Sequence, residues 1–306
     1  MLDLSVIILT YNEELHIKRA IDNVYDIVKE IFIIDSYSTD RTIEIAKRYS
    51  KVHILQHKWE NNYSKQFNWG LNNAPIKTEW VMRLDADEYL TNELIVELKD
   101  KLPSISKEIS GITVNRRYYF MGKWMKRGIY PVKLMRIFKY RKAFCEERLM
   151  DEHIQLIEGD NIDFRNDIVD ENLNDLSWAC HKYINYAVRE AADLLDIEYN
   201  ITEVALNDKN RYISDQAKKK RNMKHRYAKS PLFLRAFLYF LYRYILRGGI
   251  LDGKVGFIFN FVGALWYRTF VDVKIIEIKK ACGDNPELIR DYLSKHYNLT
   301  FDFSSK

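Results

Sequence analysis

The chain has 306 residues, enough to bury a large core in one domain or two. Its hydrophobic content of 47% and charged content of 30% are typical of a folded protein and exclude the intrinsically disordered class. The net charge of +5 is unevenly distributed, because residues 216–251 contain ten Lys or Arg and no Asp or Glu. This basic segment predicts an anionic partner, such as a membrane, a nucleic acid or an acidic ligand.

The cysteines and the N-terminus indicate a reducing compartment. Cys145, Cys180 and Cys282 are widely spaced and form no CxxC pair, which favours free thiols over a disulfide framework or a zinc site. The opening stretch "MLDLSVIILTYNEE" lacks the pattern of a signal peptide, since Asp3 stands where positive charge belongs and the apolar run is short. We therefore expect a cytoplasmic protein.

The first hundred residues predict strands that alternate with helices. Apolar, strand-like runs lie in residues 4–14, 29–40, 51–57 and 79–88. Helical spacing follows each of them, in residues 15–27, 40–49, 63–74 and 92–102. In the first helix we expect Asn12 to be the cap, and Leu15, Ala20, Ile21 and Val24 to share one face. Short alternation of this kind is typical of a wound, mostly parallel α/β sheet.

The pattern changes after residue 110. Residues 111–120 and 130–140 predict two strands joined by the aromatic, basic loop "MGKWMKRGI". Residues 159–175 are rich in Asp and Asn and predict a loop, and residues 181–195 predict a helix. We find no internal repeat and no low-complexity linker.

Polar residues gather where the predicted strands end. They are Thr10, Tyr11, Asn12 and Glu13 after the first strand, Asp35, Ser36, Ser38 and Asp40 after the second, and Asp85, Asp87 and Glu88 after the fourth. Open parallel sheets bind ligands beyond the carboxyl ends of their strands. No GxGxxG or GxxxxGK[ST] pattern follows any strand, so the common glycine-rich routes to phosphate are absent.

The remaining route to phosphate is a divalent cation. Three acids in four positions repel one another, so positive charge is needed among them. Mg²⁺ is commonly held by one or two carboxylates and completed by phosphates of the ligand. The sequence therefore predicts a metal that carries a nucleotide diphosphate.

Several of these residues also have plain structural interpretations. Asp40 is equally suited to cap the helix that follows it, whereas Thr91 and Asn92 are nearer caps than Asp85 or Asp87 for the fourth helix. Asn68 and Gln66 are suited to bonding an adjacent loop. His153 and His181 are possible ligands of a transition metal, but satisfied structural histidines are the commoner case.

Four motifs in residues 4–90 together resemble those of the family 2 glycosyltransferases. They are "VIILTYNEE", "IFIIDSYSTDRT" with its D-x-S-x-D-x-T, "NYSKQFNWGL" and the D-x-D of "LDADE", in the expected order. The resemblance, which extends to enzymes of bacterial lipopolysaccharide and capsule synthesis, implies the GT-A fold, a wound, mostly parallel sheet flanked by helices. We therefore expect a catalytic domain at 1–215, with a nucleotide-sugar half to about residue 110 and an acceptor half at 111–215.

The resemblance also implies roles for individual residues. It assigns the nucleotide base to Thr10, Tyr11 and Asp35, the ribose and diphosphate to Asp85, and Mn²⁺ or Mg²⁺ to Asp87 with Asp85. Glu13 and Asn68 are expected on the nucleotide side. Asn62 fills the place where some members carry a basic residue, with Lys65 nearby.

The acceptor side of the resemblance is less specific. In "MDEHI" it implies that Glu152, or its neighbour Asp151, is the base that deprotonates the acceptor hydroxyl during inverting transfer. The alternative for this pair is a solvated helix start. Trp124, Arg127 and Tyr130 are candidates for an acceptor-binding loop, although a loop with aromatic residues equally packs under itself.

Residues 216–306 predict a basic, amphipathic helical region. A helix over 232–246 would place Arg235, Tyr239, Tyr242, Arg243 and Arg247 in one arc. It would span about 22 Å, and the apolar stretch 255–271 is also short, so neither reaches across a hydrocarbon core of about 30 Å. We expect a helix pair, joined by a turn at Gly248, Gly249 and Gly253, that lies in the membrane interface with its basic residues on anionic headgroups.

Taken together, these features predict an inverting, metal-dependent glycosyltransferase that uses a nucleotide sugar, most often UDP-linked. The expected acceptor is a lipid-linked glycan or lipopolysaccharide, and the expected location is the inner face of the cell membrane, bound through residues 216–270. Packing of the C-terminal helices on the catalytic domain, or in a homodimer, is the alternative, and nucleic acid is not an expected partner. The rival functions are a nucleotidyltransferase and a non-catalytic membrane-binding module with a degenerate nucleotide site.

Overall fold

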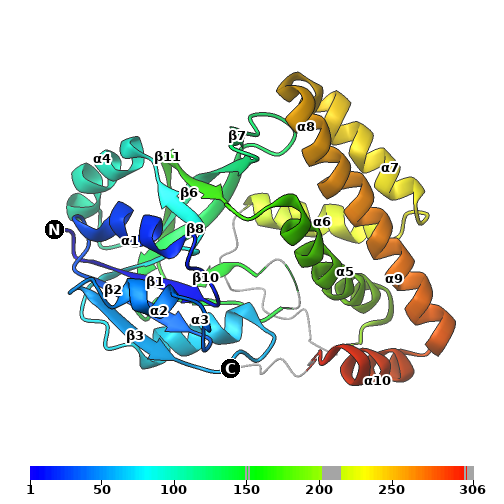
Figure 1. The fold of residues 1–306 in the computed structure, drawn as a ribbon, viewed down its shortest axis with the longest axis horizontal. Coiled ribbons are helices and arrows are strands. Elements are labelled where there is room, and N and C mark those ends of the chain that lie inside the picture. Colours follow the sequence, from blue (N-terminus) through cyan, green and yellow to red (C-terminus); the bar gives the residue numbers. More distant parts are fainter. Residues whose placement is uncertain (149, 151, 202–214, 300, 302–306) are drawn as a thin grey trace.

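The computed structural model describes residues 1–148, 150, 152–201, 215–299 and 301, with side chains left undescribed at 215–221. Figure 1 shows a twisted sheet with helices packed on it, and beside it a separate group of helices built from α5 to α10. The strand order of the main sheet is β3-β2-β1-β4-β8-β6-β11-β5, and β7 pairs with β6 at its side. A second sheet consists of β9 and β10 alone.

The strands have the following bounds: β1 Leu4–Thr10, β2 Glu30–Asp35, β3 Val52–Gln56, β4 Trp80–Arg83, β5 Glu88–Leu90, β6 Ile109–Phe120, β7 Lys123–Trp124, β8 Val132–Lys139, β9 Ala143–Cys145, β10 Ile154–Leu156 and β11 Asp160–Glu171. Strands β1 to β4 pair in parallel, whereas β8 is antiparallel to both β4 and β6. Strand β11 is parallel to β6 and antiparallel to β5. The sheet is thus mixed, and it contains the wound, mostly parallel arrangement that the sequence predicts.

The α-helices are α1 Ile17–Tyr25, α2 Thr42–Ala46, α3 Tyr63–Asn73, α4 Asn92–Lys101, α5 Leu176–Tyr199, α6 Asp215–Ala228, α7 Leu234–Leu241, α8 Gly253–Asn260, α9 Tyr267–Cys282 and α10 Pro286–Tyr297. Short 3₁₀ segments lie at Leu102–Ser104 and Gly249–Asp252, and π-helical segments at Tyr242–Leu246 and Phe261–Trp266.

Alternation along the buried strands places helices on both faces of the sheet. Val6 and Ile8 of β1 join the core under α1, α2 and α4, whereas Ile7 joins the core under α3 and the β9–β10 hairpin. Strand β1 is therefore covered on both sides, which explains its continuous apolar run. A Cβ built at Gly70 of α3 would lie 2.7 Å from Ile34 Cγ1, so only glycine allows this approach.

Two sequence-based predictions near the start of the chain are wrong. Asn12 does not cap α1, because its side chain instead accepts a hydrogen bond from Thr39 N across the loop after β2. Leu15 is 55% exposed and does not belong to the buried face of α1, which Ile17, Ala20, Ile21 and Val24 form.

The Asp- and Asn-rich segment 159–175 is not the predicted loop. Most of it forms β11, a strand of twelve residues between β6 and β5. Phe164, Ile168 and Val169 are buried there. Its last residues, Asp170 and Glu171, reach the turn after β4, where Glu171 N donates to Asp87 O at 3.1 Å, so this end of the strand is part of the candidate site.

A second hydrophobic core lies among the helices beyond the sheet. Ala191 and Leu195 of α5 pack there with Val271 of α9 and Ile289 of α10. Helix α5 therefore packs with helices on the far side of the expected domain boundary at residue 215. It also approaches the sheet edge, and so it connects the two parts of the molecule (Figure 1).

The C-terminal helices form the predicted hairpin, with its turn at Gly248–Gly253. Helix α7 continues as the π-helical segment Tyr242–Leu246, and the chain returns through α8, Phe261–Trp266 and α9. This return is one helical run of 34 residues, Gly249–Cys282, so the prediction of a short helix is wrong. By length and composition it is, among the described residues, one helix that could cross a membrane, a weak test that core helices of soluble proteins also pass.

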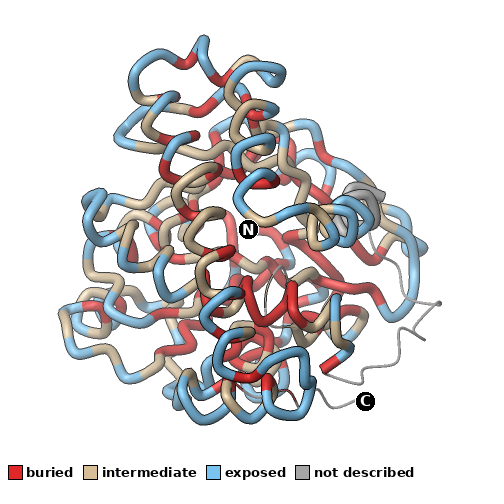
Figure 2. Tube along the Cα trace, turned by 90° about the vertical axis from the view of Figure 1, so that its right-hand side faces the viewer, coloured by how far each residue is buried: buried red, intermediate tan, exposed pale blue. Residues whose placement is uncertain are grey.

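The hairpin does not present its arginines in the predicted way. Arg235 and Arg243 are only 4% and 6% exposed. Arg235 donates to Asp272 Oδ1 of α9 through Nε at 2.8 Å, and Arg243 lies over the rings of Tyr239 and Phe259. The outer surface is apolar instead, and Figure 2 shows the hairpin as a largely exposed or half-buried projection.

Candidate active site

The ends of β1 and β2 are joined by a hydrogen-bonded polar pair. Thr10 Oγ1 donates to Asp35 Oδ1 at 3.0 Å, and both residues are buried. Asp35 also accepts from Ser38 N at 2.9 Å and from Ser38 Oγ. Both carboxylate oxygens are therefore bonded within the protein, whereas the ring of Tyr11, next along the chain, is 61% exposed at the rim.

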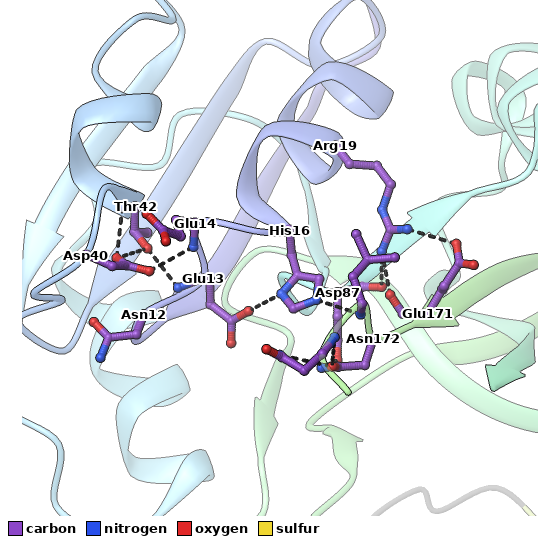
Figure 3. Close-up of polar contacts among 12 residues, drawn as sticks. Asn12, Glu13, Glu14, His16, Arg19, Asp40, Thr42, Asp87, Glu171 and Asn172 are labelled. Atoms are coloured by element: carbon purple, nitrogen blue, oxygen red, sulfur yellow. Dashed lines mark hydrogen bonds and ion pairs between the residues drawn. The ribbon is translucent and has the colours of Figure 1, made fainter. Parts of the chain in front are cut away.

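Glu13 is positioned by a buried histidine that the sequence did not single out. His16 Nδ1 lies 2.6 Å from Glu13 Oε2, and Leu173 N donates to His16 Nε2 at 2.9 Å (Figure 3). Because Nε2 accepts a hydrogen bond, the ring proton belongs on Nδ1, which donates to Glu13. His16 thus connects the end of β1 to the segment after β11.

Arginine supplies the positive charge around Asp85. Arg136 Nη2 of β8 lies 3.0 Å from Asp85 Oδ2 and also bonds Glu88. Arg83 Nε lies 3.5 Å from Asp85 Oδ1, which accepts a hydrogen bond from Tyr63 as well. Burial alone would raise the pKa of Asp85, but the charges of Arg136 and Arg83 outweigh it and hold the pKa well below its ordinary value. Asp85 is therefore an anchored carboxylate.

Asp87, in contrast, has one carboxylate oxygen that forms no hydrogen bond with the described residues. Its Oδ2 accepts from Asn172 Nδ2 at 3.0 Å, and its main-chain oxygen accepts from Glu171 N at 3.1 Å and Arg19 Nη2 at 3.2 Å. Oδ1 forms no hydrogen bond with the described residues. Figure 3 shows this turn tied to the end of β11.

Glu13, Asp87 and Asp170 of β11 form an acidic region at the carboxyl ends of the strands, and Lys182 of α5 lies near it. The sequence analysis indicated neither Asp170 nor Lys182. Asp170 pairs with Glu88 of β5 and with Tyr118 of β6, and its Oδ2 lies 3.2 Å from Arg116 Nη1. Burial raises the pKa of Asp170 to about 6, and the charge of Asp87 adds to the rise against the opposing charge of Arg116. The prediction of a loop at 159–175 concealed this residue.

Of the two acids predicted as the catalytic base, the structure describes one. Asp151 lies outside the described residues, whereas Glu152 is half-buried two residues before β10. Ile154 of β10 pairs with Cys145 of β9, and burial raises the pKa of Cys145 to about 12, with a contribution from the charge of Glu152. Cys145 Sγ is 3.9 Å from Arg83 Nη1. Glu152 therefore belongs to the Arg83 side of the site and Asp170 to the Asp87 side.

Asn62 and Asn68 have structural partners. Asn62 caps α3 by accepting from Lys65 N at 3.0 Å, and its amide donates to Arg148 O. Asn68 exchanges two hydrogen bonds with the main chain of Cys145, at 2.7 and 2.8 Å. Both residues hold the β9 region against α3, which matches the structural interpretation of Asn68.

The predicted acceptor loop is docked on the helical hairpin. The rings of Trp124 and Tyr130 meet edge to face at 5.4 Å, and Arg127 N donates to Asp252 Oδ2 at 3.0 Å. The Tyr130 hydroxyl lies 3.3 Å from both carboxylate oxygens of Asp167. The loop therefore connects β6 and β8 to the turn before α8 (Figure 1).

Among the described residues, neither histidine considered as a metal ligand joins a group of three possible ligands. His181 is exposed, and its Nδ1 lies 2.8 Å from Ser177 O. The main-chain nitrogen of His153 donates to Glu146 Oε1 at 3.3 Å. Within the described part of the chain, no cluster of three or more His, Cys, Asp or Glu side chains has metal-binding geometry. A site of one or two carboxylates completed by phosphates needs no such cluster.

Solved structures that resemble this chain are distant. The crystal structure of S. aureus TarS 1–349 covers 99% of this chain and 94% of its own, at 14% identity and a TM-score of 0.42. Glucosyl-3-phosphoglycerate synthase from Mycobacterium tuberculosis, in complex with Mn²⁺, UDP and glucosyl-3-phosphoglycerate, covers 38% of this chain and 44% of its own, at 21% identity and a TM-score of 0.30. At these TM-scores neither likeness assigns a function.

Sequence relatives are similar over about a third of this chain or less. The SPbeta prophage-derived glycosyltransferase SunS of Bacillus subtilis (strain 168) is 38% identical over 87 residues, which are 28% of this chain and 20% of SunS. Uncharacterized glycosyltransferase RT0209 of Rickettsia typhi is 36% identical over 99 residues, or 32% of each chain. The matches thus span about a fifth to a third of these relatives. The model of the family "Glycosyl transferase family 2" matches residues 5–159, half of the chain, and with the strand-end carboxylates inside that range the protein belongs to this family of glycosyltransferases.

Proposed function

We propose that the protein is an inverting, metal-dependent glycosyltransferase that transfers a sugar from a nucleotide sugar, with UDP as the expected nucleotide. The observation that carries the proposal is that the two aspartates after β4 differ in how their carboxylate oxygens are bonded. Asp85 is anchored by Arg136 at 3.0 Å, whereas Asp87 keeps one carboxylate oxygen without a partner in the described part of the chain. Membership of the glycosyltransferase family favours this reaction over nucleotidyl transfer.

The residues present suit a divalent cation. Asp87 Oδ1 is a hard oxygen donor. Glu13 and Asp170 add negative charge to the same region, because Asn172 and Leu173, directly after β11, bond Asp87 and the His16 that bonds Glu13. Asp87 is therefore the residue that would hold Mn²⁺ or Mg²⁺. When bound, the cation would neutralise the charge that develops on the departing diphosphate.

The chain's own side chains perform the remaining tasks in this proposal. Thr10 and Asp35 fix the rim on which Tyr11 meets the nucleotide base, and Asp85 stays ionised to accept hydrogen bonds from the ribose. Glu152, or Asp151 beside it, removes the proton from the acceptor hydroxyl as that oxygen attacks the anomeric carbon. The oxygen–carbon bond forms on one face while the bond to the diphosphate breaks on the other, which inverts the anomeric centre.

We propose further that the acceptor is lipid-linked, as in bacterial surface polysaccharide synthesis, and that the helical hairpin holds the enzyme on the inner face of the membrane. The support is an outward apolar surface whose members are each at least 42% exposed: Phe233, Leu234, Phe237, Leu238, Tyr242, Ile245, Leu246, Ile250, Leu251, Phe257 and Phe261. The two carboxylates in residues 216–272, Asp252 and Asp272, are buried, so no acid opposes an anionic headgroup.

Sugar transfer and membrane binding have separate tests. Hydrolysis and transfer are measured on a panel of nucleotide sugars with and without Mn²⁺ or Mg²⁺, for the wild type and for Asp87→Asn. The matched control is Asp163→Asn, a half-exposed aspartate paired with Lys133. We expect metal-dependent turnover that Asp87→Asn abolishes and Asp163→Asn retains, and turnover that is insensitive to metal and to Asp87 contradicts the proposal.

Membrane binding is measured by sedimentation with anionic liposomes. Leu246→Glu with Leu251→Glu places two charges on the apolar surface and should release the protein, while Asp87→Asn should bind as the wild type does. Liposome binding that ignores both leucines would contradict the membrane proposal. A protein that binds liposomes and shows no turnover with any donor would instead be the non-catalytic module.

A further inference from the structure

Lys182 is a cation held close to the acidic region without a direct partner. It lies in the second turn of α5, and its Nζ is 4.9 Å from the ring centroid of Trp178 and 5.7 Å from that of Tyr186. These rings stand four residues before and after it on the same helix face. Lys182 forms no ion pair and no hydrogen bond with the side chains and main chain of the described segments, so its three N–H donors have no acceptor there.

The carboxylates near Lys182 come from three strands of the site. Asn172 and Leu173, which lead from β11 toward α5, donate to Asp87 Oδ2 at 3.0 Å and to His16 Nε2 at 2.9 Å, and His16 lies 2.6 Å from Glu13 Oε2, so the start of α5 is held beside these acids. Burial alone would lower the pKa of Lys182, but Tyr186 and the charges of Asp87, Asp170 and Glu13 outweigh it and raise the pKa above its ordinary value. The ammonium is therefore charged at every physiological pH. Glu13 follows β1, Asp87 follows β4, and Asp170 lies in β11, so α5 supplies a positive charge to the carboxyl edge of the sheet.

Such an arrangement has a consequence for ligand binding. A cation attracted by three carboxylates but bonded to none retains donors for a further anion, and phosphate oxygens are strong acceptors. The same ammonium opposes a second cation at Asp87, because like charges repel. An incoming diphosphate would reverse this opposition, since it carries enough negative charge to lie between the ammonium and the metal.

We propose that Lys182 binds the diphosphate of the donor and makes metal binding at Asp87 depend on the nucleotide. This inference rests on the proposed glycosyltransferase site. In the empty enzyme Lys182 offsets part of the charge of Asp87, Asp170 and Glu13, and Mn²⁺ binds weakly. With the nucleotide present, Lys182 would donate to the diphosphate and Asp87 would hold the metal that the diphosphate's charge attracts, so each ligand would increase the affinity for the other.

Calorimetry with Mn²⁺ alone, and with UDP in the presence of Mn²⁺, tests the inference on the full-length chain. Lys182→Met should bind Mn²⁺ alone about tenfold more tightly and UDP about tenfold more weakly than the wild type, the change expected for one partly screened charge. UMP should lose less affinity than UDP, because it lacks the second phosphate. Lys182→Arg should retain most UDP affinity, and Lys47→Met, which removes an exposed charge on another surface, should change neither value.

In Lys182→Met the affinity for Mn²⁺ should rise while the affinity for UDP falls. These opposite changes distinguish a role in ligand binding from a structural role of Lys182. A variant that is merely misfolded would lose affinity for both probes, and thermal melting of each variant checks folding directly. Equal UDP affinity in Lys182→Met and the wild type overturns the inference and leaves the proposed function intact. A wild-type protein that binds no UDP with Mn²⁺ overturns both.

Discussion

Arg136 Nη2 lies 3.0 Å from Asp85 Oδ2, and the same guanidinium bonds Glu88. One side chain of β8 thus fixes two of the three acids that follow β4, and it is only 3% exposed. The third acid, Asp87, is left to face the site. Within the acidic motif, Asp85 and Glu88 therefore stabilise the end of the strand, whereas Asp87 is available to a ligand.

Removing the guanidinium should destabilise the fold. Arg136→Met leaves the buried Glu88 and the partly buried Asp85 without their principal cation, so we expect the free energy of unfolding to fall by about 3–5 kcal/mol. Urea denaturation measures the loss. Arg41→Met is the control, because Arg41 forms an exposed pair with Glu14 that is worth about 1 kcal/mol or less. Equal losses in the two variants would show that Arg136 does not anchor the motif.

Asp170 should make stability depend on pH. Its pKa is about 6 in the folded chain against a reference value of 3.8, so the fold favours the protonated form. This contribution is fully present below about pH 4 and is lost as the pH rises through 6, an effect of about 3 kcal/mol. Asp170→Asn cannot titrate and should flatten the fall in unfolding free energy between pH 4 and pH 7. Urea denaturation at several pH values checks this.

The control for this pH effect is Asp163→Asn, which removes a half-exposed aspartate from the same strand. It should retain the wild-type slope between pH 4 and pH 7. If Asp170→Asn also retains that slope, Asp170 is ionised throughout the range and its burial is offset by Arg116.

Arg235 and Asp272 join the two arms of the helical hairpin in a pair that is almost fully buried. Asp272→Asn leaves the guanidinium of Arg235 without its carboxylate and should lower the free energy of unfolding by about 3–5 kcal/mol. The double variant Arg235→Met with Asp272→Leu removes both charges and should recover much of that loss. A double-mutant cycle in denaturant measures the coupling, and simple additivity of the two changes would contradict a direct pair.

The N-terminal half was largely predictable because its pattern is local. Continuous apolar runs such as Val6 to Leu9 indicate strands buried on both faces, and the order of strands and helices then indicates a wound sheet. The same pattern predicted that Thr10 and Asp35 lie at the carboxyl edge of the sheet, and in the structure they are hydrogen-bonded there. Asp87 likewise lies where the alternation of elements implied.

Strand β11 was not predictable from such a pattern, for a physical reason. Asp and Asn disfavour strands, so "DNIDFRNDIVDE" indicates a loop. In the folded chain three of its five acids have a basic partner on β6 or β8: Asp163 with Lys133, Asp167 with Arg117, and Asp170 with Arg116. Those partners are distant in sequence, and the inward arginines of the hairpin escaped prediction for the same reason.

Two acids on opposite sides of the site, Glu152 and Asp170, are candidates for the catalytic base, and their variants should behave differently. Glu152 precedes β10, which pairs with Cys145 beside Arg83, whereas Asp170 contacts Arg116 and lies on the Asp87 side. If Glu152 is the base, Glu152→Gln should lower turnover by about 10²- to 10⁴-fold with little change in UDP and Mn²⁺ affinity, because a base acts on the acceptor proton alone. Asp170→Asn should instead weaken Mn²⁺ binding, since Asp170 adds negative charge near Asp87.

Single-turnover rates and calorimetry on the two variants distinguish these outcomes. Asp151→Asn, measured in parallel, decides between the neighbouring acids of the "MDEHI" motif. The assignment reverses if Asp170→Asn loses turnover with intact metal and nucleotide binding while Glu152→Gln remains active. In that case the proton acceptor belongs to β11, and the pKa of about 6 at Asp170 should appear as the acidic limb of the rate profile, because a base must be deprotonated to act.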